Sequence, residues 1–167
     1  MKKQYFFDAC ACLLFPLANL GAYFLTAHGM MVSCSWGLLG RLLLAALCEE
    51  LFFRGLLLRE CVERHWLNPC KSVLAVSLVF ALLHLLNAAL FSQAWLQVSF
   101  AFAASLVLSL VYLRYGQLWP CILTHILVNI SSVLAPRNES MEYFGIYCLA
   151  VCLGIAYAAP GLRSYAR

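Results

Sequence analysis

Long apolar segments alternate with short polar ones along the chain. The apolar runs occupy residues 5–27, 38–60, 72–90, 95–113, 118–134 and 143–160. A helix needs about 20 residues, within a range of roughly 17–25, to cross the hydrocarbon core of a bilayer. The pattern therefore predicts an all-α fold, a polytopic transmembrane helical bundle of about six spans with a polar site buried in its core.

Polar segments between the runs supply the expected loops. They are CVERHWLNPCK at 61–71, RYGQ at 114–117 and APRNESME at 135–142. Pro69 suits a loop or the start of a helix, and RYGQ is typical of a tight turn. We see no internal repeat and no second domain, so the sequence predicts one integral-membrane domain over residues 1–167.

Basic residues fall unevenly on the two ends of the predicted helices. With the N-terminus inside, Arg41 and Arg137 lie at the outer face. The cytoplasmic side receives eight others: Lys2, Lys3, Arg59, Arg64, Lys71, Arg114, Arg163 and Arg167. An excess of Lys and Arg marks cytoplasmic loops. We therefore expect a multi-pass cell-membrane protein with a cytoplasmic N-terminus.

Composition supports the membrane assignment. Hydrophobic residues make up 65% of the chain and charged residues 11%, more apolar surface than a water-soluble domain can bury. The lipid bilayer is thus an expected partner, whereas a net charge of +4 gives no reason to expect nucleic acid. The nine cysteines form no CxxC pair, and we expect most of them to be reduced packing residues.

A few polar side chains interrupt the predicted spans: Glu49, Glu50, Arg54, His84, His125 and Asn129. A charge at the bilayer centre costs about 2.5–3.5 kcal/mol on insertion scales, so such residues usually face a protein interior or a wet cavity. At about 1.5 Å per residue, Glu50 and His125 lie roughly 12 Å from the cytoplasmic ends of their spans. His84 and Asn129 lie roughly 18 Å in. Three helices therefore carry polar groups to a similar depth.

The spacing of these residues suggests separate roles. Glu50 and Arg54 are four apart on a helix and can form an ion pair. Glu49 points about 100° away from Glu50, so the two carboxylates cannot do the same work. A glutamate with two histidines in a water-poor cavity can activate water. The same Glu49, His84 and His125 would also suit a divalent metal such as zinc.

Three short motifs follow one another along these helices. EELFFR fits EExxxR, FALLH fits FxxxH, and HILVN fits HxxxN. In this order, within spans, they resemble the CPBP family of CAAX prenyl proteases, bacteriocin-processing enzymes and related glutamate-type intramembrane endopeptidases. The resemblance covers residues 49–129, inside a motif-bearing core at about 38–134.

The resemblance implies a role for each matching position. Glu49 would be the general base that activates water, and His84 would help to position that water. His125 and Asn129 would form the oxyanion-stabilising side. Glu50 and Arg54 would be a supporting pair, with Phe80 packed beside the site.

The resemblance also bears on cofactor and substrate. It is compatible with a metal-free mechanism, which we favour, and with a divalent metal such as zinc. The short chain is more similar to compact bacterial members than to the best-known CAAX enzymes. The expected substrate is a membrane-anchored peptide or protein: a prepeptide, a CAAX-like tail or a C-terminal anchor, the last being preferred.

Other functions remain open at this point. Buried Glu and His also occur in transporters and proton-conducting proteins, His84 and His125 could ligate a haem or metal, and a family member can be non-catalytic. The polar groups gather at one depth instead of crossing the membrane, which favours a reaction site. Ser105 and Ser109, four apart, are expected to mediate close helix packing.

Overall fold

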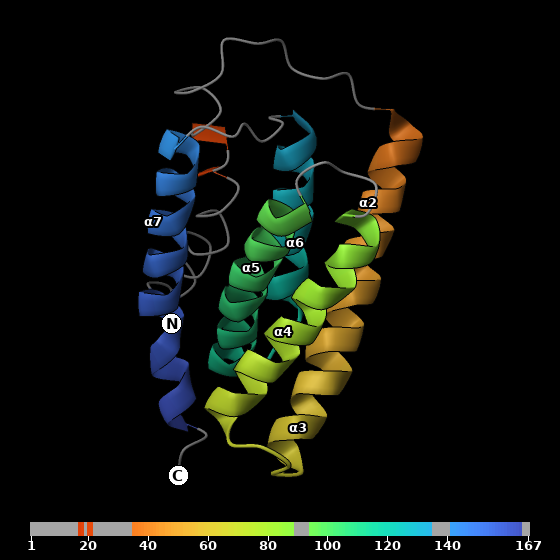
Figure 1. Ribbon diagram of the computed structural model, residues 1–167. Coiled ribbons are helices and arrows are strands. Elements are labelled where there is room, and N and C mark those ends of the chain that lie inside the picture. Colours follow the sequence, from red (N-terminus) through yellow and green to blue (C-terminus); the bar gives the residue numbers. More distant parts are fainter. Residues whose placement is uncertain (1–16, 19, 22–34, 89–93, 135–140, 165–167) are drawn as a thin grey trace, which may run out of the picture. The chain divides into compact units, whose positions relative to one another are not determined.

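The structure is a computed structural model that describes residues 17–18, 20–21, 35–88, 94–134 and 141–164. All longer regular elements in this part of the chain are helical (Figure 1). In order they are α2 (Trp36–Glu50), η1 (Leu51–Leu58, a π-helix), α3 (Arg59–Glu63), α4 (Pro69–Ala88), α5 (Ala94–Tyr115), α6 (Trp119–Leu134), α7 (Met141–Ala158) and η2 (Ala159–Ser164, a 3₁₀-helix).

The helices agree with the apolar runs, and the predicted all-α class is confirmed. The runs at 72–90, 95–113, 118–134 and 143–160 correspond to α4, α5, α6 and α7. The run at 38–60 corresponds to α2 and η1, which continue into α3 without a break. The predicted first span, 5–27, lies almost wholly outside the described residues.

Among the described residues, one helical segment is long enough to span a membrane. Gln97–Tyr115 in α5 is long and apolar enough to cross a bilayer, and three apolar segments are shorter: Pro69–Leu85, Trp119–Val133 and Gly145–Ala158. The number of six spans therefore stays a prediction.

Local capping explains two of the helix boundaries. The side chain of Asn68 accepts a hydrogen bond from the Lys71 amide at 2.8 Å, and Pro69 occupies the first position of α4. Both are preferred choices for these positions. Of the two alternatives for Pro69, a loop or a helix start, the structure shows the helix start, three residues before the predicted span at 72–90. At the other boundary, α5 ends before Gly116, whose φ of 65° is readily adopted only by glycine. The tight turn expected there is confirmed.

Contacts divide the chain into two compact units. Unit 1 comprises residues 1–49 and 119–157, and unit 2 comprises residues 50–118 and 158–167. Within unit 2, α4 packs along α5, and η1 packs against both of them. Phe53 of η1 and Phe80 of α4 meet edge to face in its core, with ring centroids 4.9 Å apart. The boundary between the units falls between Glu49 and Glu50, two consecutive residues of α2.

The exposed and buried faces of α4 differ in character. Its large exposed side chains are aliphatic: Leu74, Leu78, Val79, Leu82, Leu83 and Leu85. Its fully buried side chains include Ser72 and Ser77. A soluble helix would bury the leucines and expose the serines. The reverse arrangement on α4 suits an apolar solvent on the outer face and small polar residues at helix contacts.

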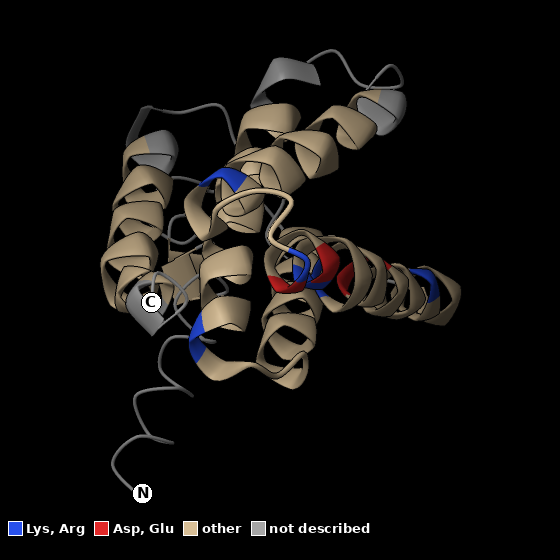
Figure 2. Cartoon of the chain, turned by 90° about the horizontal axis from the view of Figure 1, so that it is seen from below, with Lys and Arg blue, Asp and Glu red and all other residues tan. Residues whose placement is uncertain are grey.

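Charged side chains of unit 2 concentrate at one end of its helices. Figure 2 shows acidic and basic residues close together at α3, where Arg59 pairs with Glu63 at 2.9 Å and Arg64 pairs with Glu60. Lys71, on the first turn of α4, and Arg114, on the last turn of α5, belong to the same end because α4 and α5 form an antiparallel hairpin.

Candidate active site

The buried ion pair of unit 2 connects Glu50 and Arg54. The Arg54 Nη1 atom donates to Glu50 Oε1 at 2.9 Å, and both side chains are 0% exposed. Two charges out of water at this depth stabilise the fold only if they are paired and hydrogen-bonded. The ion pair expected from the four-residue spacing is confirmed.

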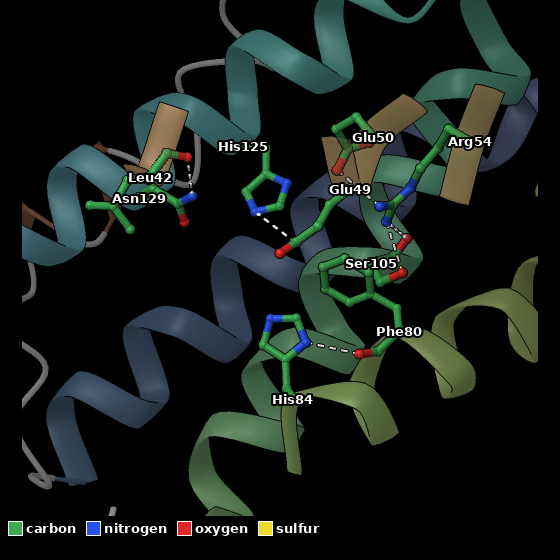
Figure 3. Close-up of polar contacts among 9 residues, drawn as sticks. All are labelled: Leu42, Glu49, Glu50, Arg54, Phe80, His84, Ser105, His125 and Asn129. Carbon is green, nitrogen blue, oxygen red and sulfur yellow. Dashed lines mark hydrogen bonds and ion pairs between the residues drawn. The ribbon is translucent and has the colours of Figure 1, made fainter. Parts of the chain in front are cut away.

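Arg54 has a second set of partners on α5. Its Nη2 atom donates to the Ser105 hydroxyl at 2.8 Å and to the Ser105 carbonyl oxygen at 3.1 Å. The guanidinium also lies over the Phe80 ring, 5.0 Å from its centroid. The ion pair with Glu50, the hydrogen bonds to Ser105 and the contact with the Phe80 ring thus hold the guanidinium group of Arg54 in one position (Figure 3).

Phe80 and His84 lie one turn apart on α4 and stack on each other, with ring centroids 4.6 Å apart. His84 Nδ1 lies 2.8 Å from the Phe80 carbonyl oxygen. Because a carbonyl only accepts hydrogen bonds, Nδ1 carries the proton and donates. A neutral His84 therefore has its lone pair on Nε2. Phe80 packs between Arg54 and His84, which agrees with its expected place beside the site (Figure 3).

In unit 1, Glu49 of α2 faces His125 of α6. Glu49 Oε2 lies 3.7 Å from His125 Nε2, and Figure 3 shows the two side chains directed at each other. This distance is too long for a direct hydrogen bond, and Oε2 has no other hydrogen-bond partner among the described residues.

Asn129 lies one turn beyond His125 on α6. Its Nδ2 atom donates to the Leu42 carbonyl oxygen of α2 at 3.4 Å. Leu42 precedes Glu49 in α2 while Asn129 follows His125 in α6, so the two helices run antiparallel. The amide group has a second N–H, which this contact leaves for another acceptor.

The two consecutive glutamates occupy different surroundings. The Glu49 side chain is 33% exposed and faces an imidazole. The Glu50 side chain is 0% exposed and is neutralised by Arg54. The separation of roles expected from their 100° offset on the helix agrees with these surroundings.

The metal alternative depends on how the possible donor side chains are grouped. A catalytic zinc takes three protein ligands, but no group of three or more His, Cys, Asp or Glu within the described residues is placed to hold a metal ion. The six cysteines in this part of the chain are free: Cys48, Cys61, Cys70, Cys121, Cys148 and Cys152. Only Cys61 and Cys121 among these six are buried, as the expected packing role requires.

Sequence reasoning did not foresee two partners of the motif residues. Ser105 was expected to mediate packing only, and it also binds Arg54. The carbonyl of Leu42 binds Asn129, and no side-chain pattern signals a backbone acceptor. No signal in the sequence singles out Ser105, because Ser109 lies in the same predicted span and its hydroxyl has no hydrogen-bond partner within the described residues.

Comparison with known proteins gives one match. Residues 31–131 match the family described as type II CAAX prenyl endopeptidase Rce1-like. The matched segment covers more than half of the chain and includes all three motifs. No curated protein and no solved structure matches the chain.

Proposed function

The chain belongs to the type II CAAX prenyl endopeptidase Rce1-like family, and from that premise we propose that it is an intramembrane endopeptidase. The family confirms the resemblance to CPBP proteins and implies a membrane location and a hydrolase. In our proposal the chain hydrolyses a peptide bond in a membrane-associated peptide or protein.

The observation that carries the proposal is the contrast between the two glutamates. A general base must reach water and substrate. Glu49 meets this requirement because its side chain is partly exposed and its Oε2 lies 3.7 Å from His125 Nε2. Glu50 is fully buried against Arg54. We therefore assign the base to Glu49 and a supporting role to Glu50 and Arg54.

The proposed reaction begins with a water molecule beside Glu49. The Glu49 carboxylate takes a proton from this water as its oxygen attacks the carbonyl carbon of the substrate. The carbonyl oxygen gains the negative charge, which N–H groups of His125 and Asn129 stabilise. The C–N bond then breaks, and the proton held by Glu49 passes to the leaving amine nitrogen.

The proposed role of His84 depends on which of its ring nitrogens carries the proton. Since Nδ1 donates to the Phe80 carbonyl, Nε2 can accept a hydrogen bond from the attacking water and orient it. This role matches the second motif of the family resemblance.

The membrane arrangement is also part of the proposal. We propose about six spans, a cytoplasmic N-terminus and one integral-membrane domain. The aliphatic outer face of α4 supports contact with lipid. The basic residues at the α3 end of unit 2, among them Lys71 and Arg114, support a cytoplasmic location for that end.

The proposed substrate is a protein or peptide that is itself anchored in the membrane. A C-terminal anchor segment is our preferred class, and a prepeptide or a CAAX-like tail belongs to the same chemistry. Lipid surrounds both enzyme and substrate, and no nucleic acid takes part.

The test is cleavage of membrane-anchored reporter proteins by the purified enzyme in liposomes. We expect Glu49→Gln to lower the rate by at least a hundredfold, which is the usual contribution of a general base. Glu63→Gln is the matched control, because Glu63 is an exposed glutamate farther along the same continuous helix, and it should cleave at the wild-type rate. Cleavage by Glu49→Gln at that rate would overturn the assignment.

Two further arms complete the experiment. Incubation with a strong chelator should leave the rate unchanged, whereas a loss restored by zinc would contradict the metal-free mechanism. Proton or solute flux that depends on Glu49, without any proteolysis, would favour the transporter alternative over a peptidase.

A further inference from the structure

Ser105 connects α5 to the EExxxR motif through Arg54. Its hydroxyl lies 2.8 Å from Arg54 Nη2, and its carbonyl oxygen lies 3.1 Å from the same nitrogen. Ser105 is 0% exposed and 51 residues distant from Arg54 in the sequence. A charge-assisted hydrogen bond in a dry interior is roughly twice as strong as a neutral one.

We propose that Ser105 is a positioning residue that fixes the guanidinium of Arg54 and, through it, the Phe80–His84 stack. The proposal rests on the peptidase function proposed above. None of the three motifs includes Ser105, so the proposal adds a residue of α5 to the motif residues.

A series of contacts from Ser105 through Arg54 and Phe80 to His84 is the physical reason for this role. Arg54 Nη1 is held by Glu50 and Nη2 by Ser105, and these two anchors set the plane of the guanidinium. That plane lies over the Phe80 ring at 5.0 Å. Phe80 in turn stacks on His84 and accepts the Nδ1 hydrogen bond that leaves the Nε2 lone pair for water. Loss of one anchor frees the guanidinium to tilt and loosens the ring beneath it.

The expected loss of rate in Ser105→Ala follows from the contacts that Arg54 keeps in this variant. In Ser105→Ala the backbone carbonyl still accepts from Arg54, so the ion pair persists and the fold survives. The lost hydroxyl removes one of two acceptors for Nη2. A displacement of about 1 Å at a reacting group can cost a hundredfold in rate, and a partial loss of restraint should cost about tenfold.

Ser109 provides the matched control. It lies one turn farther along α5, is 0% exposed like Ser105, and its hydroxyl has no hydrogen-bond partner within the described residues. Ser109→Ala therefore makes the same chemical change in the same helix without touching Arg54.

The experiment measures kcat, KM and the melting temperature of both variants in detergent or liposomes. We expect Ser105→Ala to lower kcat about tenfold at unchanged KM and to lower the Tm by about 2–4 °C, the equivalent of one modest hydrogen bond in a chain of this size. Ser109→Ala should change neither. Wild-type kcat in Ser105→Ala, equal losses in both variants, or a raised KM at unchanged kcat would overturn the proposal.

The contact between Ser105 and Arg54 can also be tested without peptidase activity, by introducing Ser105→Ala into a variant that lacks Arg54. In Glu50→Leu/Arg54→Met the charges are removed together, so Ser105→Ala should no longer lower the Tm. An equal Tm loss with and without Arg54 would overturn the contact itself. If the wild-type protein cleaves nothing, the peptidase proposal fails, and this comparison still decides whether Ser105 holds Arg54.

Discussion

At the scale of single residues, burial decides what each charge can do. Glu50 and Arg54 are 0% exposed and form an ion pair with each other. Glu49, the preceding residue of the helix, is 33% exposed and faces His125. Two consecutive carboxylates of one helix thus have different surroundings, and in our proposal the first is the reactive one.

This separation predicts opposite phenotypes for the two glutamates. Glu50→Ala leaves the buried guanidinium of Arg54 without its counter-charge, which costs about 3–5 kcal/mol in the free energy of unfolding. Glu50→Leu/Arg54→Met removes both charges and should recover most of that loss. Unfolding in detergent measures both variants. A double variant as unstable as Glu50→Ala would show that the pair is not the cause.

At the scale of elements, the helix that carries the EExxxR motif changes its geometry within the motif. The π-helix η1 follows directly after Glu50, and its i→i+5 hydrogen bonds make a wider turn than an α-helix. Such segments are frequent at functional sites. Within η1, Gly55 permits close packing: a Cβ there would lie 3.0 Å from Leu118 Cδ1. The absence of a side chain on Gly55 lets η1 approach the connection that follows α5.

This close approach predicts a size-dependent effect. Gly55→Val should lower the free energy of unfolding by about 1–3 kcal/mol through overpacking against Leu118. Adding Leu118→Ala should restore part of the loss, because it vacates the space that the valine needs. Thermal unfolding of the single and double variants provides the measurement. Independent, additive losses would mean that the two positions do not meet.

At the scale of the whole molecule, apolar and charged side chains are separated on the exposed surface. Aliphatic side chains cover the exposed face of α4, and the charges of unit 2 gather at its α3 end. This distribution suits a bilayer that surrounds the helices and an aqueous phase at the charged end.

The proposed orientation predicts a labelling pattern. Cys70 is exposed on the first turn of α4, at the charged end. In a variant that keeps Cys70 as its only cysteine, an impermeant maleimide should label inverted membrane vesicles and not intact cells. Arg137→Cys in a cysteine-free chain should show the reverse. Labelling of Cys70 from outside intact cells would contradict a cytoplasmic N-terminus combined with the predicted spans.

The helices of the described residues, the turn at Gly116 and the Glu50–Arg54 ion pair were predictable from the sequence alone. These features depend on apolar runs, capping preferences and the four-residue repeat of a helix, all of which are local. Family membership was also visible, because its motifs are short and lie within single helices.

The partners that polar groups find on other helices were visible only in the folded structure. The bond from Arg54 to Ser105 joins residues 51 apart, and the contact between Glu49 and His125 joins α2 to α6. The π-helical geometry of η1 likewise has no signal in its residues. Such features depend on how the helices pack against one another. Packing brings together residues that are far apart in the sequence and that follow no regular spacing.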